Sequence, residues 1–98
     1  MPAYVIGNIT TLETGDELAE YRRRVGGTIE MYGGRLVIRG GNVDVFEGDW
    51  LPVHLTLMEF PDGASAREWF ESPEYREIVE LRRGGVQTQL VLLEPQRP

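Results

Sequence analysis

The sequence contains no cysteine and no lysine, and its one histidine is His54. Without cysteine the chain can form no disulfide, no thiolate nucleophile and no thiolate metal site. Because all ten cationic side chains are arginine, Schiff-base chemistry on an internal lysine is excluded. A single imidazole also excludes a zinc or iron site that needs several histidines of one chain. We therefore expect no resident metal and no cofactor.

Other common signals are missing as well. The sequence has no phosphate-binding GxxxxGK[ST] or GxGxxG motif, and no apolar run approaches the roughly 20 residues that span a bilayer. The net charge is −6, and the arginines are scattered between acidic residues without a basic stripe. We expect a cytoplasmic protein that binds neither nucleic acid nor membrane.

The 98 residues, of which 41% are hydrophobic and 27% charged, are typical of one globular domain spanning residues 1–98. The hydrophobic pattern predicts strands over residues 4–10, 35–39, 53–60 and 88–93, and helices over 15–32, 64–71 and from Ser72-Pro73 to Gly84-Gly85. After Gly40-Gly41-Asn42 we expect the second strand to resume weakly over residues 43–46.

Glycine pairs punctuate the first predicted helix. Gly33-Gly34 suits its C-terminal cap, whereas Gly26-Gly27 inside it costs about 1 kcal/mol per glycine relative to alanine. The backbone either bends at Gly26-Gly27 or another element packs closely there. Around Arg22-Arg23-Arg24, the spacing of Glu20 and Arg24 favours an ion pair on a solvated helix face.

The order β-α-β-β-α-β is that of the ferredoxin-like α+β fold, in which two helices cover one face of a four-stranded antiparallel sheet. In the first predicted strand, Tyr4, Ile6 and Asn8 lie on one face, and Val5, Gly7 and Ile9 lie on the other. Apolar residues on both faces indicate a sheet that is covered on both sides. At this length the second cover must be another chain, so we predict a homodimer.

A series of short motifs runs through the chain: Gly33-Gly34-Arg35, Arg39-Gly40-Gly41, Glu47-Gly48-Asp49-Trp50, Glu59-Phe60-Pro61, Ser72-Pro73-Glu74-Tyr75 and Arg82. With its flanking strands, this series resembles the domain-of-unknown-function-1330 family of the dimeric α+β barrel superfamily. The resemblance implies a barrel-like dimer of ferredoxin-like protomers, each with a small pocket. Relatives in that superfamily include cofactor-independent monooxygenases, muconolactone isomerase-like proteins and haem-binding peroxidases, but a shared fold does not transmit a function.

Arg39 and Glu59 are the charged candidates for a site. Arg39 ends a predicted strand, where it can pair with Glu47 or Glu59 or anchor a ligand carboxylate. Glu59 shares a strand face with apolar residues, so its pKa is raised if it is unpaired and lowered if Arg39 or Arg82 meets it. Glu59 is therefore either a proton-transferring group or a member of a structural ion pair.

The remaining candidates are aromatic residues and His54. A lone strand histidine is more often a hydrogen-bonded sheet residue than a catalyst, yet His54 is the one imidazole available for proton transfer. Trp69 and Tyr75 either pack in the core or line a ligand site, and a tyrosine can do both. Trp50, in a predicted loop, either clamps the dimer or covers a pocket mouth.

Two hypotheses follow. The first is a dimeric binding protein that holds a small organic ligand with Arg39, Trp50, Trp69, Tyr75 and Arg82. The alternative is a cofactor-independent enzyme, monooxygenase-like or isomerase-like, that acts on a small organic acid or polyketide-like molecule. In that enzyme Glu59 or His54 moves a proton.

Overall fold

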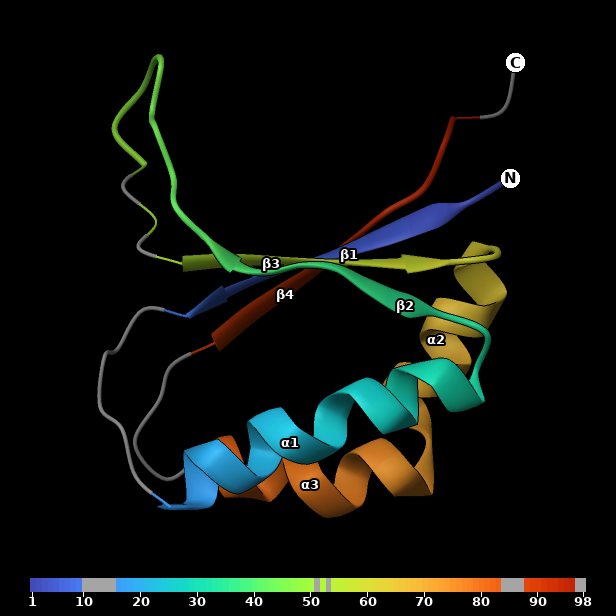
Figure 1. Ribbon diagram of the computed structural model, residues 1–98. Helices are drawn as coiled ribbons and strands as arrows, with labels where there is room; N and C mark the ends of the chain where they lie inside the picture. Colours follow the sequence, from blue (N-terminus) through green and yellow to red (C-terminus); the bar gives the residue numbers. More distant parts are fainter. Residues whose placement is uncertain (10–15, 51, 53, 84–87, 97–98) are drawn as a thin grey trace.

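The computed structural model describes residues 1–9, 16–50, 52, 54–83 and 88–96; for residues 9, 16–18, 41, 54, 81–83 and 88 it describes the backbone alone. The elements follow the predicted order: β1 (Ala3–Ile9), α1 (Asp16–Met31), β2 (Arg35–Gly41), β3 (His54–Phe60), α2 (Gly63–Glu71), α3 (Pro73–Arg83) and β4 (Thr88–Leu93). The strands form one antiparallel sheet in the order β2-β3-β1-β4. All three helices lie on one face of this sheet (Figure 1), which confirms the ferredoxin-like α+β architecture.

The end of α1 is set by its glycine pair. Gly33 has φ +82°, and the amides of Gly33 and Gly34 donate to the carbonyls of Glu30 and Ile29, both at 3.0 Å. These two bonds form a Schellman motif, which satisfies carbonyls that the helix leaves open. Gly34 also lies against buried side chains, because a Cβ there would come within 2.8 Å of Ile29 and 2.7 Å of Phe60. Because Gly34 has no side chain, β2 can begin in direct contact with the core.

The second helical segment is broken at Ser72 into α2 and α3, as the Ser72-Pro73 signal predicts. The Ser72 hydroxyl accepts from the amide of Tyr75 at 3.1 Å and donates to the carbonyl of Trp69 at 2.7 Å. One side chain thus caps the end of α2 and the start of α3. At the other end of α2, Asp62 accepts from the amide of Ser65 at 2.7 Å. None of the helices described is both long and apolar enough to cross a membrane.

The predicted weak strand over residues 43–46 is wrong. Gly40 and Gly41 instead belong to β2, which pairs with β3 through two register shifts and ends where Gly41 faces Leu55. β3 begins one residue before Leu55, so among the described residues no strand pairs with residues 43–46. They form part of a long loop that rises from the sheet on the side away from the helices (Figure 1), and Phe46 in it is 97% exposed.

The core lies between the sheet and the helices. Its fully buried side chains are Trp69, Tyr75, Phe60, Ile29, Ile78 and Val79. Along α1 and the residue after it, side chains at helical spacing belong to this core or pack against it: Tyr21, Val25, Ile29 and Tyr32. This spacing turns one face of the helix toward the sheet.

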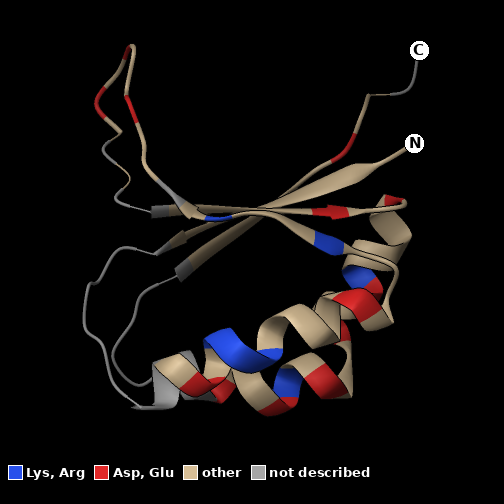
Figure 2. Ribbon diagram, viewed as in Figure 1, with Lys and Arg blue, Asp and Glu red and all other residues tan. Residues whose placement is uncertain are grey.

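The other face of the sheet is open and largely apolar. A row of four aliphatic residues crosses it through directly paired positions, one from each strand: Ile38, Leu57, Ile6 and Val91. Ile38 and Val91, at the two edges, are 48% and 58% exposed. Figure 2 shows that charged residues gather on the helices and on the β2–β3 loop, while the sheet carries few. The alternation read from the first strand places Ile6 on this open face, as the register confirms.

The helix-surface ion pairs differ from the expected pattern. Glu20 pairs with Arg23, three residues along, and not with Arg24. Arg24 instead bridges to Glu77 of α3 at 3.4 Å. The expected Glu20–Arg24 pair is therefore wrong. α3 packs beside α1 and offers Arg24 a carboxylate that the sequence of α1 does not reveal.

Candidate functional site

Glu59 lies on the open face of the sheet, half-buried, and pairs with a different arginine from those expected. Nε of Arg35, directly opposite on β2, donates to Oε1 of Glu59 at 3.0 Å. Hydrogen bonds from Arg35 and from the Tyr4 hydroxyl hold the pKa of Glu59 below its ordinary value. The same carboxylate raises the pKa of Tyr4. Glu59 is thus ionised at neutral pH, and its geometry is that of a structural ion pair.

Arg39 lies on the opposite side of the sheet from Glu59. A Cβ added to Gly26 of α1 would lie 3.6 Å from Nη2 of Arg39 and 3.6 Å from Leu36, so the guanidinium lies over α1. The register shift between Leu36 and Ile38 explains this position, because one extra residue in β2 moves each following side chain to the opposite face of the sheet. At Gly26, β2 lies at ordinary contact distance from an added Cβ, so an alanine would fit there and close packing is not what requires the glycine.

Three other predicted residues are spread over the molecule. Trp50 is 58% exposed in the β2–β3 loop, away from the helices. His54 begins β3 and Arg82 lies near the end of α3, but the side chains of both fall outside the described residues. Among the side chains that the structure describes, the predicted catalytic residue Glu59 therefore does not meet the predicted ligand-binding residues Arg39 and Trp50.

The aromatic candidates do come together, in the core between α1, α2 and α3. The ring centroids of Trp69 and Tyr75 are 4.2 Å apart, and those of Phe70 and Tyr75 are 5.8 Å apart. The hydroxyls of Tyr75 and Tyr21 lie 3.2 Å from each other. The indole Nε1 of Trp69 donates to Oγ1 of Thr28 at 3.0 Å. Because Trp69 and Tyr75 are only 1% and 0% exposed, packing accounts for most of their surface.

One edge of this aromatic cluster forms the wall of a cavity of about 170 Å³ between α2 and β4, called here the α2–β4 pocket. Its apolar lining consists of Val5, Ala66, Trp69, Phe70, Leu90, Val91 and Leu92. Two charged residues, Arg67 and Glu71, complete the lining. Of the predicted ligand-binding residues whose side chains the structure describes, Trp69 is the one that lines this pocket.

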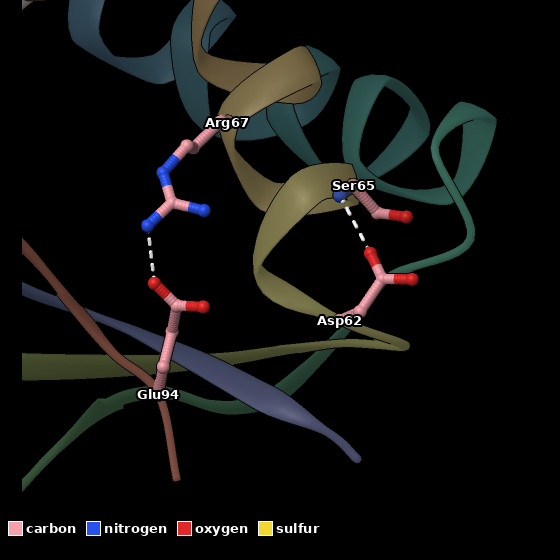
Figure 3. A network of polar contacts seen from close by, with 4 residues as sticks. All are labelled: Asp62, Ser65, Arg67 and Glu94. Carbon is pink, nitrogen blue, oxygen red and sulfur yellow. Dashed lines mark hydrogen bonds and ion pairs between the residues drawn. The ribbon is translucent and has the colours of Figure 1, made fainter. Parts of the chain in front are cut away.

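Arg67 also lines a second hollow of about 400 Å³, which lies beside the start of α2 and both chain ends. In Figure 3, Arg67 extends from α2 toward Glu94, which directly follows β4, and the two side chains form an ion pair. The nearby carboxylate of Asp62 turns to the start of α2 instead (Figure 3), and the amide of Ser65 holds its pKa below the ordinary value. Sequence reasoning missed Arg67, because an arginine next to Glu68 in a short helix is typical of an ordinary solvated surface residue.

In the part of the chain that the structure describes, no three His, Asp or Glu side chains lie close enough together to hold a metal ion. The arrangement instead offers an apolar cavity with an arginine at its rim. Such a site suits a small organic molecule with one polar group.

Comparison with known protein families identifies the family of this chain. Residues 2–96 match the family described as Domain of unknown function (DUF1330). The chain belongs to this family. The resemblance drawn from the motifs is therefore confirmed over nearly the whole length of the chain.

Solved structures of similar proteins agree with the fold of this DUF1330 protein. A protein of unknown function from Rhodopseudomonas palustris is 28% identical and has a TM-score of 0.71, with 99% of this chain and 84% of that chain covered. A dimeric ferredoxin-like protein of unknown function from a Jannaschia species is 18% identical, with a TM-score of 0.70 over 97% of this chain and all (100%) of that one.

SnoaB, a cofactor-independent oxygenase from Streptomyces nogalater, has a TM-score of 0.67 at 11% identity, with 99% of this chain and 95% of that chain covered. At this identity the likeness shows the shared fold alone. Among curated proteins, none matches the sequence.

Proposed function

We propose that this protein is a homodimer that binds a small organic ligand in the α2–β4 pocket of each protomer. The pocket itself is the observation that carries the proposal. Its apolar walls include the indole of Trp69, and its volume of about 170 Å³ is slightly larger than that of an engineered cavity of about 150 Å³ that holds benzene. Hydrophobic walls with a few polar groups are the usual composition of a ligand pocket.

The open sheet face supports the dimer. Its aliphatic row runs from Ile38 to Val91 across all the strands, and the helices leave it uncovered. An apolar face of this kind is stabilised when a second copy packs on it. The likeness to a dimeric ferredoxin-like protein from Jannaschia agrees with that arrangement.

The alternative is a cofactor-independent enzyme, which the likeness to SnoaB suggests at the level of fold. The charge arrangement favours binding over proton transfer by Glu59. That carboxylate lies on the open face, whereas the α2–β4 pocket lies on the helix side, and its lowered pKa makes it a weak base near neutrality.

Two measurements on the purified chain test the proposal. Native mass spectrometry at low micromolar concentration should give a dimer, and a sharp monomer mass would reject that part. For the pocket, NMR of a ¹⁵N-labelled sample should show the indole resonance of Trp69 shifting as benzamide is added. Leu90→Trp, which fills the pocket, should abolish the shift, whereas Leu90→Met should retain it. A shift that survives Leu90→Trp in a folded protein would place binding elsewhere.

A further inference from the structure

Arg67 is the one residue that lines both the α2–β4 pocket and the hollow beside the chain ends, among the cavities found in the described residues. Arg67 directly follows Ala66, which also lines the pocket. Its side chain is 59% exposed to solvent. A ligand whose apolar body fills the pocket would therefore bring its polar group out beside Arg67. The nature of that polar group follows from what Arg67 binds in this structure.

Arg67 binds a carboxylate that the chain itself supplies. Nη2 of Arg67 donates to Oε1 of Glu94, which directly follows the strand that provides Leu90 and Leu92 to the pocket wall. Gly63 makes room for this carboxylate, because a Cβ there would collide with the carboxyl group of Glu94. The guanidinium is thus already paired with a carboxylate beside the pocket, in the neighbouring hollow that Glu94 lines, and arginine is well suited to bind such groups.

The internal carboxylate is easily replaced. Both side chains of the pair are substantially exposed, at 59% for Arg67 and 41% for Glu94, and ion pairs of this kind contribute little to stability. A free carboxylic acid would gain the same interaction together with burial of its apolar body, while Glu94 would return to water. Glu71 also lines the pocket, so a cationic ligand is the competing possibility.

We propose that the α2–β4 pocket recognises a small apolar carboxylic acid with a body about the size of one ring, and that its carboxylate binds Arg67 in place of Glu94. This assignment rests on the proposed function of the same pocket. It makes Glu94 an internal competitor, which occupies Arg67 while the pocket is empty and leaves it when the acid binds.

Three probes of matched shape test the charge preference by isothermal titration calorimetry: benzoate, benzamide and benzylamine. Benzoate should bind most tightly to the unmodified protein. Arg67→Gln should weaken benzoate binding by roughly ten- to a hundredfold, the usual effect of losing a charged hydrogen-bond partner, and should weaken binding of the neutral benzamide far less. Glu94→Gln should tighten benzoate binding several-fold. Arg22→Gln and Glu30→Gln, exposed changes on α1, control for net charge and should have little effect.

The outcomes separate this assignment from the proposed function. If benzamide binds but benzoate binds no better, or if Arg67→Gln leaves benzoate unaffected, the acid preference is wrong and the pocket remains a binding site. Tighter binding of benzylamine would assign the rim to Glu71 and overturn the proposal. Weaker benzoate binding in Glu94→Gln would show that Glu94 supports the ligand and does not compete with it. If none of the probes binds, both the pocket function and the acid preference fail.

Discussion

The two glycine pairs of α1 predict opposite effects of the same substitution, glycine to alanine. Gly27 is exposed in the interior of the helix, and a Cβ there would have nothing within 4 Å. Alanine would restrict the unfolded chain and favour the helix without any new contact, so Gly27→Ala should stabilise the protein by about 0.5–1 kcal/mol. For a chain of this length, that gain corresponds to a rise in Tm of about 2–8 °C.

Gly34 lies three residues beyond the helix end and does not have a positive φ, so space alone decides its substitution. A Cβ would come within 2.7 Å of the Phe60 ring and 2.8 Å of Ile29, whose side chains are 1% and 0% exposed. Neither neighbour has free volume into which it can move. We therefore expect Gly34→Ala to destabilise the fold by about 1–3 kcal/mol, the usual cost of overpacking a core.

Urea unfolding followed by far-ultraviolet circular dichroism measures both effects. All proteins should be compared at one chain concentration, because the stability of a dimer depends on concentration. The midpoint should rise for Gly27→Ala and fall for Gly34→Ala, with similar slopes if the unfolded states are alike. A destabilised Gly27→Ala would show that the helix does not continue through the glycine pair. A Gly34→Ala protein as stable as the parent would refute the close packing of the turn against the core.

Three further outcomes are expected. Thr28→Val should cost about 1–3 kcal/mol in urea unfolding because it leaves the buried indole N–H of Trp69 without its acceptor, and the matched Trp69→Phe/Thr28→Val double variant should cost less than the two single changes added together. Val91→Asp should shift sedimentation toward the monomer, whereas Met31→Asp, an equally exposed change on α1, should not; an unchanged dimer in Val91→Asp would exclude the sheet face as the interface. The folded state lowers the pKa of Glu59, so the ionised carboxylate stabilises the protein above pH 4.5, and this stabilisation is lost as the pH falls through the folded pKa. Glu59→Gln should therefore flatten the acid side of a plot of Tm against pH. An unaltered plot would contradict the pairing.

Local signals in the sequence were enough to predict most of the elements. The period-2 pattern gave the faces of β1, Gly33 and Gly34 gave the end of α1, and Ser72 gave the break between α2 and α3. Each of these signals acts within a few residues, the strand pattern through alternate burial of side chains and the two helix signals through local hydrogen bonds. The expected strand over residues 43–46 failed because a strand also needs a neighbour, and β3 begins too late in the chain to provide one.

The candidate site depended on contacts that are distant in sequence. Simple alternation along β2 would place Arg39 on the face of Glu59, but the bulge after Leu36 moves it to the helix side and leaves Arg35 as the partner. A bulge depends on the register with the neighbouring strand, which the sequence of β2 alone does not contain.

By itself, the sequence determined the family, the order and type of the elements, and the absence of lysine and cysteine chemistry, because these follow from residue identity and short-range periodicity. Only the tertiary structure decided which charges meet and where a cavity opens. Arg67 and Glu94 are 27 residues apart and meet because the end of β4 passes beside α2. Pockets and ion pairs of this kind are properties of packed surfaces, and neighbouring residues in the chain carry no record of them.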